Sequence, residues 1–371
     1  MNVDNLVDIC DNRSVSTGIP CMIMRGGSSK GAYFRREDLP EDPAERDAVL
    51  RRLMGSPDAR QVDGLGGAHP LTSKVAVVAP STDDDADVDY LFLQVGVDND
   101  VVSDRQNCGN LLAGVAPFAI ERTLVDAPAD GEAHVRIRML NTDSIATARL
   151  SMAGGAPVYD GDTTISGVPG TAAAIALDFQ NIAGGSSGAL LPSGSVADEI
   201  EGVECTLVDN GMPVVVMRAA DLGVTGYEDR AELEANEALR TVLEKIRLQA
   251  GELMGLGDVS NSTVPKLAMV AAPRDGGNIC TRTFIPHRCH DAIGVLGAVS
   301  VATAAFLPDS PGASVLTAPT DGVVRLEHPT GHFDAVIELS SGEDGIVDVP
   351  RAGIIRTARK LMDGIAFPRP E

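Results

Sequence analysis

The 371-residue chain contains no tryptophan, four tyrosines, eight phenylalanines, and only five lysines among its thirty basic residues. Its core must therefore be built from aliphatic side chains, and 39 glycines and 22 prolines favour a β-rich fold with many tight turns. Acidic residues outnumber basic ones by 53 to 30, which gives a formal net charge of −23. Such a field repels phosphate backbones and anionic bilayers, so nucleic-acid and membrane partners are disfavoured.

The chain also lacks a disulfide framework and a membrane-length apolar run. Its six cysteines have no regular spacing and fit a reducing compartment. The longest uncharged stretch, residues 292–307, is too short to cross a bilayer and predicts a buried helix. Residues 1–17 carry acidic side chains and no apolar segment, unlike a secretory or transit peptide. Together these features predict a cytoplasmic protein.

The two halves of the chain carry similar patterns in the same order. The matched segments are 27–28 with 210–211, 35–39 with 218–222 and, after a slip of nine positions, 73–79 with 265–271. An apolar helix that begins at Cys108 is matched by one that begins near His290. At about 150 residues per domain the length suits two domains. We therefore predict two pseudo-symmetric α+β lobes, residues 18–185 and 186–371, with a cleft between them.

Cys108 lies where a reactive thiolate would be favoured. Asn107 is a good N-cap residue and an apolar helix follows, so Cys108 is expected at the positive end of the helix dipole. Gly109 would let a ligand approach the backbone closely. The alternative is a buried structural cysteine, which is common in protein cores.

Lys74 directly precedes an apolar strand, residues 75–79. Burial at the end of that strand would favour the neutral amine, which could act as a general base. Glycines 64, 66 and 67 would let the preceding loop wrap around a small ligand. On spacing alone, a lysine that only extends its amino group to solvent fits equally well.

Two further segments could bind anions. The backbone N–H groups and hydroxyls of residues 25–31 could hold a carboxylate, although a plain turn fits too and the Walker pattern is missing. Arg282 and His287 could grip carboxylates just before a helix N-terminus. Because residues 280–290 contain no CxxC pair, a metal site there is disfavoured. The other histidines are predicted to be surface or packing residues: His69, His134, His328 and His332.

Five motifs resemble those of the 2-methylaconitate isomerase family: residues 19–31 (IPCMIMRGGSSKG), 63–67 (DGLGG), 72–76 (TSKVA), 106–110 (QNCGN) and 284–290 (FIPHRCH). The similarity runs from about residue 18 to residue 366. Within that family the chain is most similar to tautomerases that act on 4-oxalomesaconate in bacterial gallate and protocatechuate breakdown. The resemblance implies a diaminopimelate-epimerase-like α+β fold, in which two lobes each curl a sheet around a central helix and share one active site.

The resemblance further implies that Lys74 and Cys108 form an acid–base pair, with Lys74 the preferred base and the reverse assignment open. Such a pair would move a proton within a small-molecule tricarboxylate by a keto-enol or allylic shift, with no metal or organic cofactor. Only the first half carries a cysteine at its helix start, which argues against a symmetric two-thiol racemase. The expected substrate-binding residues are Arg25, Ser28, Ser29, Lys30, Gly66, Ser73, Asn107, Gly109, Asn110, Arg282 and His287.

Two other functions stay open at this point. The same scaffold could isomerise 2-methylaconitate in propionate metabolism. Alternatively, the chain could bind a tricarboxylate without catalysis, in which case Lys74 and Cys108 would be unnecessary. The sequence also leaves open which product isomer forms and whether the protein is a homodimer.

Overall fold

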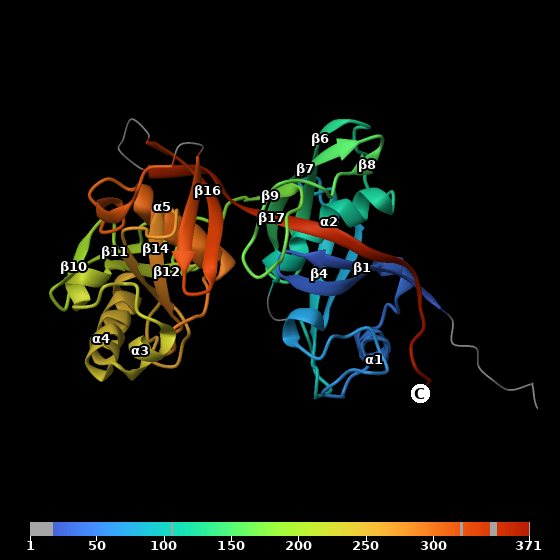
Figure 1. The fold of residues 1–371 in the computed structure, drawn as a ribbon, viewed down its shortest axis with the longest axis horizontal. Coiled ribbons are helices and arrows are strands. Elements are labelled where there is room, and N and C mark those ends of the chain that lie inside the picture. The colour runs from blue at the N-terminus through green and yellow to red at the C-terminus, as the bar shows by residue number, and fades with distance from the viewer. Residues whose placement is uncertain (1–17, 105–106, 320–321, 342–346, 371) are drawn as a thin grey trace, which may run out of the picture.

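The computed structural model describes residues 18–104, 107–319, 322–341 and 347–370. Residues 1–17 and Gln106 of the cysteine motif lie outside these ranges, so the predicted lack of a targeting peptide stays a prediction. The described residues form two halves that stand side by side, with helix α2 in one and helix α5 in the other (Figure 1).

In the first half, strands surround helix α2 (Gly109–Glu121). These strands are β1 (Ile19–Gly26), β2 (Ser29–Arg35), β3 (Lys74–Pro80), β4 (Val88–Val95), β5 (Val102–Ser103), β6 (Gly131–Met139), β7 (Ser144–Ala153), β8 (Ala156–Pro157) and β9 (Ala174–Phe179). Residues 111–120 of α2 are all buried, and the helix contacts β1 to β4 and β6 to β9. A helix that is apolar all round needs such a cover, which explains why the sheet curls.

The second half repeats this arrangement around helix α5 (Val295–Phe306). Its strands are β10 (Asp198–Ile200), β11 (Val203–Asp209), β12 (Pro213–Arg218), β13 (Lys266–Ala271), β14 (Ile279–Phe284), β15 (Val323–His328), β16 (Gly331–Ser341) and β17 (Val347–Ala366). β12 pairs parallel to β13 as β2 does to β3, and β14 pairs parallel to β15 as β4 does to β6. The predicted architecture, two α+β lobes that each surround a central helix, is confirmed.

The starts of two helices have different causes. Helix α1 (Pro43–Met54) begins directly after Asp42, because the carboxylate of Asp42 accepts hydrogen bonds from the N–H groups of Ala44 and Glu45. Helix α5, by contrast, begins at Val295 and not near His290. The imidazole Nδ1 of His290 accepts the N–H of Ala292 at 2.9 Å, which stabilises a non-helical turn before the helix.

Helices α3 (Arg230–Ala235) and α4 (Glu237–Leu253) contribute buried residues to a second apolar cluster, with strands β11 to β14. The remaining elements are the short 3₁₀ turns η1 (Arg36–Asp38), η2 (Pro70–Thr72), η3 (Ala219–Leu222) and η4 (Ala313–Val315). Within the described part of the chain, no helix combines the length and apolarity that a membrane crossing demands.

Strand β17 connects the halves (Figure 1). Residues 347–354 pair with β16 of the second half, whereas residues 352–357 pair with β9 and residues 358–366 pair with β1 of the first half. The carboxyl-terminal part of the chain therefore completes the sheet around α2. The boundary near residue 185 stays a prediction, and this return of the chain to the first half was not anticipated.

Tyr33 fixes the position of α2 on the sheet, and removal of its hydroxyl tests this role. The fully buried Tyr33 hydroxyl donates to the Leu111 carbonyl at 2.6 Å. Tyr33→Phe should lower the free energy of unfolding by about 1–2 kcal/mol, measured by urea denaturation, because a buried hydrogen bond is lost. The matched control is Tyr227→Phe, whose hydroxyl donates to the Ala272 carbonyl at an exposed position. Equal losses of unfolding free energy in the two variants would contradict this role of Tyr33.

Candidate active site

The structure brings Lys74 and Cys108 into direct contact. Lys74 is the first residue of β3 and Cys108 immediately precedes α2, and the Lys74 Nζ lies 3.2 Å from the Cys108 Sγ. Both side chains are buried, with 8% and 7% of their surface exposed. The Phe92 ring centroid lies 5.3 Å from Nζ. An amine and a thiol at this distance can pass one proton between them.

Close packing in the sheet fixes the backbone of Lys74. The buried Ser73 hydroxyl donates to the Val95 carbonyl at 2.9 Å and accepts from Gln61 Nε2 at 2.7 Å. A β-carbon added to Gly31 would lie 2.8 Å from the Lys74 carbonyl, so no larger residue fits on the neighbouring strand. Ser73 therefore uses its hydroxyl to hold the segment before Lys74.

The glycine loop before Lys74 is tightly packed. A β-carbon added to Gly64 would lie 2.2 Å from the Gly55 nitrogen, and one added to Gly66 would lie 2.2 Å from the Gln61 side chain. Neither glycine has a positive φ. The glycines are therefore needed for close approach within the protein, and a role of Gly66 in binding substrate stays a prediction.

The start of α2 differs in one detail from the prediction. Cys108 itself is the N-cap residue, and no side chain caps the helix. Asn107, the predicted N-cap, instead donates its Nδ2 to the Thr142 hydroxyl at 2.5 Å. The first N–H groups of α2 are therefore left without a side-chain acceptor beside the Cys108 sulfur, where they favour negative charge.

Tyr33 and Tyr90 lie close to Cys108 but do not titrate. The Tyr90 hydroxyl donates to the Cys108 carbonyl at 3.4 Å. Burial, with a further contribution from Cys108, raises the pKa of each phenol well above its ordinary value. Both phenols stay protonated in the working range of an enzyme, so the acid–base role predicted for Lys74 and Cys108 does not fall to them.

Several predicted binding residues gather where the turn between β1 and β2 packs on α2. The Ser28 hydroxyl accepts from Asn110 Nδ2 at 3.3 Å, and a β-carbon on Gly27 would lie only 2.2 Å from Asn110 Oδ1. Arg25 donates Nη1 to the Gly27 carbonyl at 2.8 Å and to the Thr357 hydroxyl at 2.9 Å. Arg25 thus stabilises this turn and attaches it to β17.

Two buried oxygens near this turn and helix start make no hydrogen bond to the described residues: Ser29 Oγ and Asn107 Oδ1. Buried polar atoms normally have partners, so these two are available to a ligand. Lys30 lies beside the glycine loop that precedes Lys74, since its Nζ would be 3.5 Å from a β-carbon on Gly67.

The starts of the two central helices face each other. A β-carbon on Gly109 would lie 3.0 Å from Val295 Cγ2, and Val295 is the first residue of α5. The Lys74–Cys108 pair therefore lies at the junction of the two halves. Gly109 is required there by the approach of α5.

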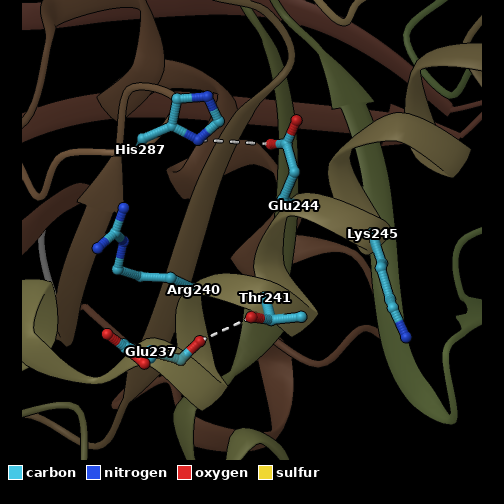
Figure 2. Close-up of a pocket in the computed structure, with 6 residues that line it drawn as sticks. All are labelled: Glu237, Arg240, Thr241, Glu244, Lys245 and His287. Carbon is cyan, nitrogen blue, oxygen red and sulfur yellow. Dashed lines mark hydrogen bonds and ion pairs between the residues drawn. The ribbon is translucent and has the colours of Figure 1, made fainter.

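Arg282 and His287 do not form the predicted anion pocket. Arg282 donates Nε to the Glu228 carbonyl at 2.8 Å and Nη1 to the Thr281 carbonyl at 2.9 Å. His287 instead lies on a surface pocket of helix α4, where its Nδ1 is 3.6 Å from Glu244 Oε2 (Figure 2). His287 thus lies beside α4, whereas α2 belongs to the other half (Figure 1). Spacing along the chain could not show that these two side chains diverge.

Two histidines that the sequence placed among surface or packing residues have unusual surroundings. Burial, His332, His290 and Arg282 lower the pKa of His328 to about 4. His332 leaves its Nε2 buried without a partner among the described residues. The spacing His-Pro-Thr-Gly-His at 328–332, which forms the β15–β16 turn, is the signal that could have drawn attention to them. No group of three or more His, Cys, Asp or Glu side chains within the described ranges is placed to hold a metal ion.

Comparison with known proteins extends these observations. A family profile described as "PrpF protein" matches residues 16–368. The (4E)-oxalomesaconate Delta-isomerase of Novosphingobium sp. (strain KA1) is 58% identical over 350 residues, which cover 94% of this chain and 97% of that protein. The 4-oxalomesaconate tautomerase of Pseudomonas putida KT2440 is 55% identical, with 94% and 96% covered.

A solved structure supports the fold. The crystal structure of methylitaconate-delta-isomerase has a TM-score of 0.86 and 35% identity, with 95% of this chain and 96% of that chain covered. The diaminopimelate-epimerase-like fold is thereby confirmed.

The contact between Lys74 and Cys108 predicts an order of thiol reactivity. Burial raises the pKa of Cys21 and Cys205 to about 12 and that of Cys289 to about 11, so these groups are thiols at pH 8. Because the thiolate is the nucleophile, Cys108 should react with iodoacetamide at pH 8 before the other described cysteines. Peptide mass spectrometry over time measures the order.

The matched variant is Lys74→Met, which keeps the length of the side chain and removes its charge. Alkylation of Cys108 should then slow by about tenfold or more, because the nearby cation no longer stabilises the thiolate. An unchanged rate at Cys108, or earlier labelling of Cys289, would show that the pair is not coupled.

Proposed function

Since the chain belongs to the PrpF protein family and is an isomerase, we propose that it moves a proton within 4-oxalomesaconate. The observation that carries this proposal is the 3.2 Å contact between Lys74 Nζ and Cys108 Sγ. The contact supplies a base and an acid side by side, and a proton shift within one substrate needs both.

The reaction follows from the position of these two groups. One group removes a proton from the carbon next to the keto function, and the electron pair of that C–H bond moves into the carbonyl to give a dienolate. The other group returns a proton to carbon or to oxygen, so the substrate gains and loses one proton in total. No electron is exchanged with a redox partner, and no metal or organic cofactor is required by the chemistry.

Lys74 is the base in this proposal and Cys108 is the proton donor. Before reaction, the pair holds one proton between nitrogen and sulfur, so that the amine can be neutral while the thiol is protonated. After Lys74 has taken the substrate proton, the ammonium and the uncapped start of α2 both stabilise the negative charge of the dienolate. The proton of Cys108 can then be given to the substrate.

Local charge explains how a protein of net charge −23 can bind a tricarboxylate. The start of α2, beside the Lys74–Cys108 pair, supplies positive charge at the junction of the halves. Acidic residues such as those at 83–85, by contrast, lie largely on the surface. The field near the site therefore differs in sign from the field far from the protein.

The proposal extends to the biological setting. The reaction would belong to the breakdown of gallate and protocatechuate, and it would take place in the cytoplasm. The two relatives named for 4-oxalomesaconate support the substrate, since each matches more than nine-tenths of this chain at 55% identity or more.

Removal of either group tests the mechanism. Lys74→Ala should fold normally and lower kcat by about 10²–10⁴-fold, because general base catalysis contributes about that much. Cys108→Ser should lower kcat by about tenfold or more, since a hydroxyl is a poorer proton donor. An ultraviolet assay with 4-oxalomesaconate measures both. Full activity in both variants would refute the assignment of Lys74 and Cys108 to the active site.

A substrate comparison tests the specificity. We expect kcat/KM for 4-oxalomesaconate to exceed that for 2-methylaconitate by about tenfold or more, because pockets distinguish substrates that differ by one polar group to that extent. Both acids are assayed with the same purified protein. A preference for 2-methylaconitate would reassign the substrate and keep the proton shift, whereas binding of either acid without turnover would favour a binding protein.

A further inference from the structure

Arg356 is a buried cation that the proposed mechanism does not use. It lies on β17, and only 7% of its surface is exposed. Its Cζ stacks 3.7 Å from the centroid of the Phe333 ring, and its Nη1 donates to the Ile355 carbonyl at 2.9 Å. Its Nε is buried and has no hydrogen-bond partner among the described residues. A guanidinium in such surroundings is costly unless an anion compensates it.

The carboxylate of Asp334, which favours the charged form of Arg356, is already paired with another cation. Both of its oxygens accept from Arg325, at 2.8 and 2.9 Å. No ion pair within the described ranges involves Arg356. Burial accordingly lowers the pKa of Arg356 to about 10.

Two histidines lie on the β15–β16 hairpin that carries Phe333, the ring on which Arg356 stacks. His332 directly precedes Phe333, and its Nε2 is a second buried nitrogen without a partner among the described residues. His328 lies beside His332 at the other end of the β15–β16 turn. The acids of the adjacent loops are engaged elsewhere: Glu327 accepts from three backbone N–H groups, and Asp291 pairs with Arg230. We refer to Arg356, His328 and His332 as the basic cluster.

The basic cluster adjoins the Lys74–Cys108 site by two separate routes. Along β17, the next residue after Arg356 is Thr357, whose carbonyl accepts the N–H of Gly27 at 2.9 Å. Across the halves, the N–H of His332 donates to the Ser166 hydroxyl at 2.6 Å. The residue after Ser166 is Gly167, and a β-carbon on it would lie 3.6 Å from the Ser28 β-carbon.

Both routes end at the turn between β1 and β2, which packs on the first turn of α2. The second half of the molecule therefore presents the basic cluster to the region where the first half presents its acid–base pair. A substrate with several carboxylates could reach both.

We propose that the basic cluster binds one carboxylate of the substrate, with Arg356 as its main ligand. This inference rests on the proposed function for the identity of the substrate. A carboxylate at Arg356 Nε would give this unpartnered nitrogen an acceptor and compensate the buried charge. The first half would then perform the chemistry, while the second half would select substrates that carry a carboxylate away from the reacting carbon.

Arg356→Gln tests the proposal, and Arg351→Gln is its matched control. Arg351 lies on the same strand, but its guanidinium is compensated by Asp178 at 2.9 Å and Glu338 at 3.3 Å. Calorimetry with propane-1,2,3-tricarboxylate, which cannot isomerise, measures binding apart from catalysis. Arg356→Gln should weaken binding by about tenfold or more and raise KM with a smaller effect on kcat. Arg351→Gln should match the wild type within about twofold.

The other outcomes are distinct. Wild-type affinity and KM in Arg356→Gln, or no binding of the tricarboxylate by the wild type, would overturn the proposal. If Arg356→Gln does not fold, as judged by circular dichroism, Arg356→Met replaces it, because it keeps an apolar stem to pack on Phe333 while it removes the buried charge, and unchanged affinity in that variant is equally decisive. If the wild type binds the tricarboxylate through Arg356 but leaves 4-oxalomesaconate unchanged, the proposed function fails and the anion site stands.

Discussion

The contact between an amine and a thiol, both buried, is the constraint on which the site depends. Lys74 and Cys108 are 3.2 Å apart only because β3 lies beneath the start of α2 and because small residues allow close approach around them. Gly31 leaves room for the Lys74 backbone, and Gly109 leaves room for α5. Burial keeps water from competing for the shared proton, while the uncapped helix start supplies a favourable field for negative charge.

The internal repeat places unlike groups at equivalent positions. Lys266 begins β13 and pairs with β12 in the way that Lys74 begins β3 and pairs with β2. The residue at the start of α5, however, is Gly294, where α2 has Cys108. The second half thus keeps the scaffold and lacks the thiol. Its contribution in our account is the basic cluster, so the pseudo-symmetric fold performs an asymmetric reaction.

Local signals in the sequence predicted local structure well. The pair of Lys74 and Cys108 and the two-lobe architecture both follow from short patterns or from family resemblance. The errors concern directions of side chains. Asn107 turns to Thr142 and does not cap α2, and His287 turns outward to α4 while Arg282 binds backbone carbonyls.

The basic cluster could not be predicted for a related reason. His328 and His332 meet only because a hairpin folds between them, and Arg356 stacks on Phe333 of that hairpin from a strand that crosses both halves. Whether a buried charge is compensated depends on the whole tertiary structure. The central claim, that Lys74 removes the substrate proton, is tested most directly by deuterium exchange next to the keto group, followed by proton NMR in heavy water. We predict exchange in Cys108→Ser, even where product forms slowly, and none in Lys74→Ala; exchange at the wild-type rate in Lys74→Ala would contradict the account.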